Sequence, residues 1–208
     1  MKKDTQITCL FLDIGGVLLT DGWNTNARKQ AAAHFHLDFP AIEDRHRLIF
    51  PIYEEGKLSL QEYLDWTVFF EKRKFTPEQL REFMFAQSAA DPATIELIRA
   101  LKARYGLKIV VVSNEARELN AHRIRKFNLN GFVDAFVSSC FVGIRKPDPA
   151  IFRLSLDIAQ VPVEQIVYVE NTAMHIDVAE GLGIQSILHT DHETTRAKLA
   201  EFGLQART

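Results

Sequence analysis

The sequence contains little that would take it out of the class of ordinary globular proteins. Its 208 residues include only two cysteines, too few for a disulfide framework or a cysteine-rich metal site. Both Cys9 and Cys140 lie in apolar runs, so we expect small buried thiols. No apolar run approaches the roughly 20 residues that span a bilayer, and the first residues lack the features of a signal peptide. We therefore expect a cytoplasmic protein with no membrane association.

An excess of charge of one sign is also missing. The 25 Lys and Arg residues nearly balance the 27 Asp and Glu residues, which gives a net charge of −2. Because a protein needs excess positive charge to attract nucleic acid over long range, we expect no nucleic-acid partner. The sequence gives no indication of the oligomeric state. A hydrophobic content of 47 % is enough for a packed core without disulfides.

Five short runs rich in β-branched residues predict strands. From residue 91 on, these runs alternate with helical patterns, and Asp91-Pro92 and Asp148-Pro149 each provide a helix cap and a first-turn proline. Such alternation predicts βαβ units and an α/β, Rossmann-like core with a parallel sheet. The predicted strands span residues 7–12, 108–112, 135–138, 166–169 and 185–188.

The stretch from 21 to 87 differs because it has no convincing strand. Residues 60–71 place apolar side chains on one helical face, and Thr76-Pro77 starts a further helix. We expect an all-helical cap inserted after the first strand, with the aromatic residues of positions 66 to 85 in its core. The predicted domains are residues 1–20 and 88–208 for the Rossmann-like core and residues 21–87 for the helical cap.

Polar side chains follow three of the predicted strands. Asp13, Ser113 and Glu170 each stand where a strand ends. The carboxyl ends of parallel strands share one edge of a sheet, and ligands bind there, so we expect these three residues to lie close together.

Taken singly, each of these residues allows more than one interpretation. Asp13 can be a nucleophile, a metal ligand or an ordinary loop or cap aspartate. The neighbouring Gly15 and Gly16 favour a functional role because they let a ligand approach the backbone closely. Glu170, followed by Asn171, is either a Mg²⁺ ligand or a loop acid near a helix cap.

The anion-binding candidates are equally open. Ser113-Asn114 can bind an anion with the help of free backbone N–H groups, or can simply cap a helix. Lys146 stands between a glycine and two prolines. It either holds a phosphate and offsets a nearby carboxylate, or is a solvated loop lysine.

The ordered set resembles the haloacid dehalogenase (HAD) superfamily over essentially the whole chain. The most specific pieces are residues 11–18 and 143–152, with support from 178–184. The position of the insert resembles the small helical (C1) cap of the family. Residues 55–59 resemble the cap of members related to sugar phosphatases, which is a softer match.

The resemblance implies a nucleophile and a metal site. Asp13 matches the aspartate that attacks phosphorus and becomes an aspartyl phosphate, which water then hydrolyses. Mg²⁺ would be held by Asp13, by the backbone carbonyl of Gly15 and by Glu170.

The resemblance also implies how the substrate is bound. Lys146 matches the lysine that acts in catalysis and in phosphate binding, because it offsets charge on the phosphate and on the nucleophile. Ser113, with Asn114 near it, matches the residue that binds the phosphoryl oxygens. The implied partner is a small phosphorylated molecule.

The sequence departs from the family pattern at three places. Phosphatases of the family usually carry a second aspartate, the general acid, at the position of Gly15. Losing such a group typically costs about 10²- to 10⁴-fold in rate. The usual last pair of aspartates appears as Glu170-Asn171, and His175 stands where Asn or Asp is common. We expect Asn171 and His175 to support the site from behind its ligands.

These features predict a Mg²⁺-dependent phosphatase for a small metabolite, restricted to good leaving groups unless Asp21, Glu54 or Glu55 replaces the acid. The alternative is a degenerate family member that binds a phosphorylated ligand or partner with little turnover. Dehalogenation by Asp13 fits less well, because position 15 lacks the expected aromatic residue and the sequence shows no obvious halide-binding arginine.

Overall fold

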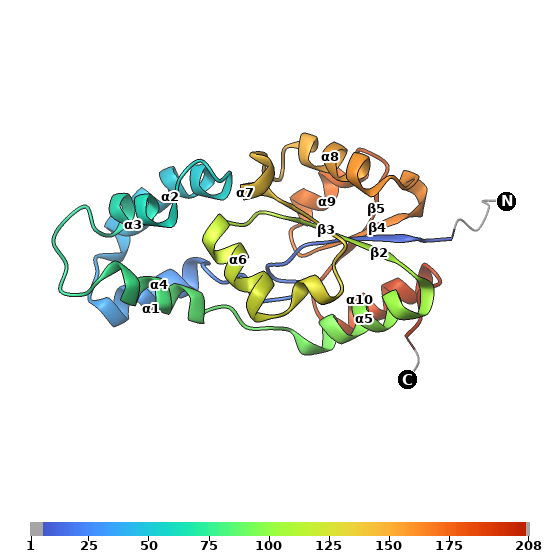
Figure 1. The fold of residues 1–208 in the computed structure, drawn as a ribbon, viewed down its shortest axis with the longest axis horizontal. Helices are drawn as coiled ribbons and strands as arrows, with labels where there is room; N and C mark the ends of the chain where they lie inside the picture. Colours follow the sequence, from blue (N-terminus) through green and yellow to red (C-terminus); the bar gives the residue numbers. More distant parts are fainter. Residues whose placement is uncertain (1–5, 207–208) are drawn as a thin grey trace.

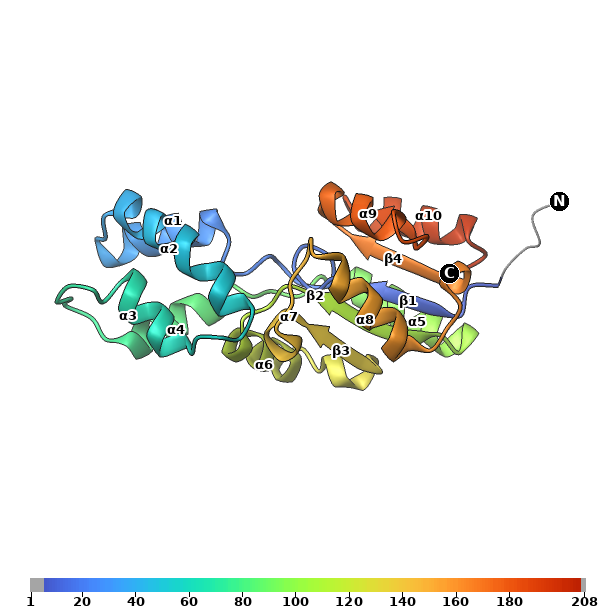
Figure 2. The same ribbon diagram turned by 90° about the horizontal axis from the view of Figure 1, so that it is seen from above.

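The computed structural model describes residues 6–206, and its core is a single parallel sheet (Figures 1 and 2). The strands are ordered β3-β2-β1-β4-β5, and every neighbouring pair is parallel. The predicted α/β sheet is therefore confirmed. The strands are β1 (Cys9–Leu12), β2 (Lys108–Ser113), β3 (Ala135–Ser138), β4 (Ile166–Glu170) and β5 (Gln185–Leu188). Ser113 and Glu170 are the last residues of their strands, so each strand extends one residue beyond its predicted end.

Helices cover both faces of the sheet (Figure 1). One face carries α5 (Pro92–Tyr105) and α10 (His192–Glu201), and the other carries α8 (Pro149–Ala159) and α9 (Ala173–Glu180). The side chains of Asp91 and Asp148 accept hydrogen bonds from first-turn N–H groups, as predicted. Shorter elements complete the connections: α6 (Arg117–Lys126), α7 (Ser139–Val142), and the 3₁₀ turns η1 (Leu129–Gly131) and η2 (Val163–Gln165).

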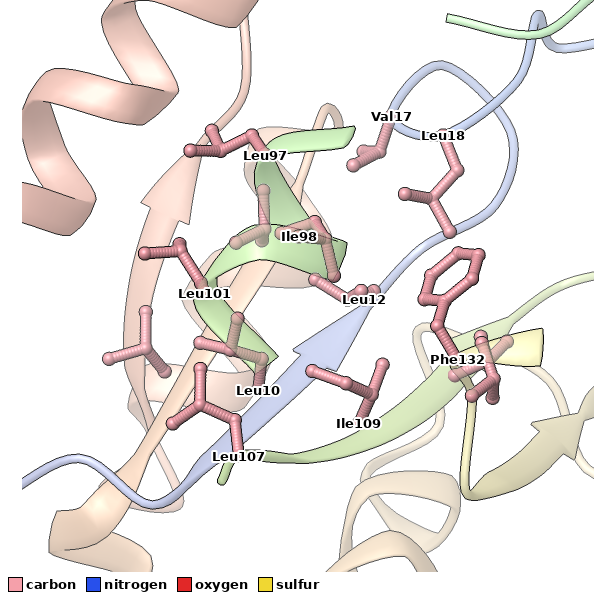
Figure 3. Packing of buried hydrophobic residues seen from close by; sticks show 14 of the residues in the cluster. Leu10, Leu12, Val17, Leu18, Leu97, Ile98, Leu101, Leu107, Ile109 and Phe132 are labelled. Atoms are coloured by element: carbon pink, nitrogen blue, oxygen red, sulfur yellow. The ribbon is translucent and has the colours of Figure 1, made fainter. Parts of the chain in front are cut away.

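The central strand β1 is buried on both sides because neighbouring residues point to opposite faces. Leu10 and Leu12 pack with Ile98 and other apolar residues of α5, as Figure 3 shows. Phe11 packs on the opposite face with Phe152 of α8. This double burial fixes the position of the residue that follows the strand, Asp13. Cys9 and Cys140 are free thiols, both buried as expected.

The insert contributes four helices beyond the end of the sheet (Figure 2). They form their own apolar cluster, with Tyr53, Tyr63 and Leu80 at its centre. The helices are α1 (Thr25–Phe35), α2 (Phe39–Glu54), α3 (Leu60–Thr67) and α4 (Pro77–Ala86). Two expectations were wrong. The helix α3 ends four residues before the predicted face does, and Trp66 and Phe70 are 53 % and 38 % exposed rather than part of the core. In the described part of the chain, no helix is both long and apolar enough to cross a membrane.

Candidate active site

Asp13 lies at the start of a tight turn at the carboxyl end of β1. Its backbone N–H donates to the carbonyl of Val169 on β4 (3.1 Å), and its Oδ1 accepts from the N–H of Ile14 (2.8 Å). Gly16 has φ +72°, and a Cβ there would lie 1.9 Å from the Asn171 side chain. Position 16 therefore favours glycine, because any side chain there would be strained and would displace Asn171.

Lys146 joins the ends of two strands through its side chain. Its Nζ lies 3.2 Å from Asp13 Oδ2 and 2.5 Å from Glu170 Oε2. It also donates to the Tyr168 hydroxyl at 3.1 Å, and Lys146 is only 1 % exposed. The structure thus brings together an acid, a lysine and a second acid from distant parts of the chain. The ammonium group is buried between two carboxylates, which supply its compensating charge.

Glu170 is enclosed by hydrogen-bond donors. Its Oε1 accepts from the backbone N–H groups of Asn171 (3.0 Å) and Thr172 (2.9 Å). Its Oε2 accepts from Lys146 and from the Tyr168 hydroxyl, and Glu170 is 0 % exposed. In the structure this carboxylate forms an ion pair with Lys146. A metal ion could reach it only after displacing these donors.

Asn171 and His175 lie on either side of Glu170. Asn171 faces the cavity above Asp13. His175 lies behind Glu170, with its Nδ1 3.2 Å from Oε2. Of the two residues expected behind the site, only His175 is placed there.

The two anion-binding candidates have different surroundings. Ser113 is buried beside Asp13, with its Oγ 3.4 Å from the Ile14 N–H. Asn114 lines the cavity, but its amide is engaged by the backbone of Lys146. Its Nδ2 donates to the Lys146 carbonyl (2.9 Å), and its Oδ1 accepts from the Lys146 N–H (2.8 Å). Asn114 therefore positions Lys146, and its predicted phosphate contact stays a prediction.

Burial and charge act against each other in this cluster. Burial raises the pKa of Asp13 to about 7, although Lys146 works in the opposite direction. Burial disfavours the charged form of Lys146 as well, but Asp13 and Glu170 outweigh it and raise the pKa of the lysine. Burial would also raise the pKa of Glu170, yet His175, Lys146 and Tyr168 hold it well below its usual range. An added cation beside Asp13 would favour its ionised form.

A cavity of about 380 Å³ opens above Asp13, between the sheet edge and the helical insert. Several polar residues in its wall were not predicted. Glu115 and Arg123, each 2 % exposed, form an ion pair at 2.5 Å. Arg28 of α1 pairs through two nitrogens with the buried Glu43. The sequence analysis identified no arginine for the site, yet two arginines line the cavity. Each forms an ion pair with its own carboxylate.

The three candidates for a replacement acid are not equivalent. Asp21 and Glu54 line the cavity, whereas Glu55 forms an ion pair with Lys57 at 2.7 Å. Glu54 is 8 % exposed, and burial raises its pKa to about 7 despite Arg145 Nη2 at 2.8 Å from its Oε2.

The insert also contacts the core at α6 and α7. Glu118 of α6 accepts from the Tyr53 hydroxyl (3.0 Å) and from the Leu60 N–H (2.9 Å). Gly56, with φ +70°, lies so close to the core that a Cβ there would be 2.3 Å from the Cys140 carbonyl oxygen. These contacts join the insert to the core.

The oxygen atoms at the cavity suit a metal ion that needs few protein ligands. Within residues 6–206, no three His, Cys, Asp or Glu side chains gather so as to hold a metal by themselves. Mg²⁺ does not require such a cage, because it usually takes one or two carboxylates, phosphate oxygens and water. Asp13 and Gly15 both line the cavity and offer oxygen atoms of this kind.

A comparison with known proteins identifies the family. The model of the haloacid dehalogenase-like hydrolase family matches residues 7–183. The chain belongs to this family, so it is a hydrolase, and the resemblance noted in the sequence is confirmed.

Individual relatives cover nearly the whole chain. A phosphorylated carbohydrates phosphatase of Thermotoga maritima is 26 % identical over 201 residues, which cover 95 % of this chain and 92 % of the relative. A HAD family enzyme of Bacteroides thetaiotaomicron, in complex with magnesium and inorganic phosphate, superposes with a TM-score of 0.70 at 21 % identity, over 87 % and 93 % of the two chains. L-2-haloacid dehalogenase of Xanthobacter autotrophicus gives 0.63 at 15 %, over 96 % and 84 %. The two structural likenesses show the fold alone.

Proposed function

We propose that this protein is a Mg²⁺-dependent phosphatase that hydrolyses a small phosphorylated metabolite through an aspartyl phosphate on Asp13. The observation that carries the proposal is the buried Lys146 ammonium, which bridges Asp13 and Glu170 at the sheet edge beneath a polar cavity. The name of the Thermotoga maritima relative supports a phosphate monoester as substrate. The magnesium and phosphate bound to the Bacteroides enzyme support the metal.

The chemistry of phosphoryl transfer explains this arrangement. Catalysis depends mainly on positioning and on offsetting charge, because a carboxylate must approach an already anionic phosphate. Two unit charges 4 Å apart interact by roughly 4 kcal/mol at an effective dielectric constant of 20. Lys146 offsets part of the repulsion, and the Ser113 hydroxyl lies beside the nucleophile to meet a phosphoryl oxygen. The Asp13 carboxylate is held in place by the Ile14 N–H.

The metal would complete the charge balance. Asp13 and the Gly15 carbonyl would hold Mg²⁺ at the cavity floor, and the bound ion would stabilise negative charge on the phosphate oxygens. Glu170, which the family pattern also names as a ligand, contributes here by keeping Lys146 charged and in place. This division of work follows from the donors that already surround Glu170.

The cavity favours a polar substrate of limited size. Its roof offers Trp23 and Arg28 from the insert, and its wall offers Glu115 and Arg123 from the core. Such a mixture of an aromatic face and charged groups suits a hydroxyl-bearing molecule, and we propose a phosphorylated carbohydrate.

Steady-state assays test the proposal directly. Wild-type protein and Asp13→Asn are compared on a nitrophenyl phosphate and on a panel of sugar phosphates, with Mg²⁺ and with chelator. We expect turnover that needs Mg²⁺ and is lost in Asp13→Asn. No turnover with any divalent metal, together with measurable phosphate binding, would instead support the non-catalytic binding protein.

A further inference from the structure

The missing side chain of Gly15 leaves a space that another carboxylate reaches. A Cβ built on Gly15 would lie 3.6 Å from both the Cα and the Oδ1 of Asp21. Asp21 belongs to the connection between the first turn and the helical insert, and it lines the same cavity as Asp13. The carboxylate therefore stands beside the place where a side chain at position 15 would begin.

The chain around Asp21 is held tightly by the core. The Thr20 N–H donates to the Ala89 carbonyl (2.9 Å), and Arg123 Nη2 donates to the Thr20 carbonyl (3.3 Å). Gly22 has φ +68°, and a Cβ there would lie 1.7 Å from Arg123 Nη2. The hydrogen bonds to Thr20 hold the chain just before Asp21, and Arg123 packs against Gly22 just after it.

Glu54, the other candidate acid that lines the cavity, is less suited to proton transfer. Glu54 has its Oε2 2.8 Å from Arg145, so it would have to give up an ion pair in order to act. Asp21 is solvent-exposed, so the water that attacks in the second step can reach it. Within residues 6–206 its carboxylate accepts one hydrogen bond, a long one from Asn171 Nδ2 at 3.5 Å.

We propose that Asp21 supplies the acid–base catalysis that Gly15 cannot; this rests on the proposed phosphatase function. In the first step an Asp13 oxygen forms a bond to phosphorus and the bond to the leaving oxygen breaks. The leaving oxygen keeps the electron pair of the broken bond, accepts a proton from the Asp21 carboxyl, and departs as an alcohol. In the second step water attacks phosphorus and gives a proton to the Asp21 carboxylate. The bond from phosphorus to Asp13 breaks, Asp13 regains its electron pair, and inorganic phosphate leaves.

The test compares substrates with good and poor leaving groups. Asp21→Asn keeps the size of the side chain but removes the transferable proton. We expect kcat/KM for an alkyl phosphate to fall by about 10²-fold or more. We expect kcat/KM for nitrophenyl phosphate to stay within about threefold, because nitrophenolate leaves without a proton. A burst of nitrophenolate is also expected, since water attack on the aspartyl phosphate slows.

A transplanted carboxylate gives an independent readout. Position 15 has ordinary van der Waals room for a Cβ, so Gly15→Asp in the Asp21→Asn background should restore at least tenfold of the alkyl phosphatase activity. Asp44→Asn, an exposed aspartate on α2 outside the cavity, is the matched control and should change neither substrate.

Two outcomes would overturn the assignment while leaving the phosphatase function intact. One is an equal effect, or no effect, of Asp21→Asn on both substrates while Asp13→Asn still abolishes turnover. The other is a loss specific to poor leaving groups in Glu54→Gln instead. Failure of the phosphatase proposal itself would look different, because wild-type protein would then release no nitrophenolate. Circular dichroism of each variant checks that it is folded, and Asp21→Asn alone decides the question if the double variant is not.

Discussion

Asn114 and Lys146 are joined by two hydrogen bonds that run from a side chain to a backbone. The amide of Asn114 both donates to the Lys146 carbonyl and accepts from its N–H. The other end of the lysine is held by Asp13 and Glu170. The long side chain is therefore fixed at its root and at its tip, and its conformational entropy is lost during folding rather than when substrate binds.

Removing the hold on the lysine backbone should reduce both activity and stability. In Asn114→Ala we expect kcat/KM for nitrophenyl phosphate to fall by about 10- to 100-fold, because a small misplacement of a catalytic group is costly. The free energy of unfolding should fall by about 1–3 kcal/mol from the lost hydrogen bonds. Kinetics and urea unfolding measure the two effects. The exposed Asn130 gives the control, since Asn130→Ala should alter neither. Unchanged kinetics in Asn114→Ala would contradict the positioning role.

Glu170 can be tested as a partner of Lys146 rather than of the metal. Glu170→Gln leaves the buried ammonium with only Asp13 as a counter-charge, so we expect a loss of about 3–5 kcal/mol in unfolding free energy. In Glu170→Asp, which keeps the charge, Mg²⁺ affinity measured by calorimetry should stay within about threefold. A tenfold or larger loss of Mg²⁺ binding in a stably folded Glu170→Asp would show instead that Glu170 is a ligand.

Glu54 should make the stability of the protein depend on pH. Its pKa in the folded protein, about 7, lies above the ordinary value of 4.5. The folded state therefore binds the proton more tightly, and this contribution is fully present below pH 4.5 and is lost as pH rises to 7. Between pH 5 and 8, wild-type protein should lose on the order of 2–3 kcal/mol more than Glu54→Gln. Urea unfolding across this range measures the difference, and Glu55→Gln should behave as wild type. Parallel pH profiles for wild type and Glu54→Gln would rule out the effect.

The contact between insert and core should tolerate no side chain at position 56. Gly56 and Gly106 both have positive φ, but a Cβ on Gly106 meets nothing within 4 Å. Gly106→Ala therefore reports the backbone strain alone, on the order of 1 kcal/mol. Gly56→Ala adds the clash with the Cys140 carbonyl. Its free energy of unfolding should therefore fall by roughly 1–3 kcal/mol more than that of Gly106→Ala. Equal unfolding free energies for the two variants would mean that the insert and the core move apart at this contact with little cost.

The strands could be predicted because they are short β-branched runs between clear helix caps. Their ends were harder to place, since Ser113 and Glu170 are polar and read as loop residues, although the ladder extends to them. The end of α3 was missed because apolar residues continue after Thr67 while the chain leaves the helix. Apolar spacing reports which side chains are buried, and it says little about where helical hydrogen bonding stops.

The meeting of site residues could be predicted from topology, but their pairing could not. Strand ends share an edge whatever their side chains do, so the meeting of Asp13, Ser113 and Glu170 followed from the predicted sheet. Lys146 lies in the loop between α7 and α8, and only the family resemblance pointed to it. The Tyr168 hydroxyl beneath Lys146 belongs to a residue whose pattern indicates only a buried strand. Likewise, Arg28 and Glu43 lie on separate helices, and nothing local links them. Pairings of this kind depend on how two elements dock.

The two hydrogen bonds accepted by Glu118 make the edge of the insert behave as one unit. A single carboxylate holds Tyr53 at the end of α2 and Leu60 at the start of α3. Moving this edge away from α6 would therefore leave both donors without their acceptor at the same time. We therefore expect a single substitution, Glu118→Ala, to release the end of α2 and the start of α3 from the core together.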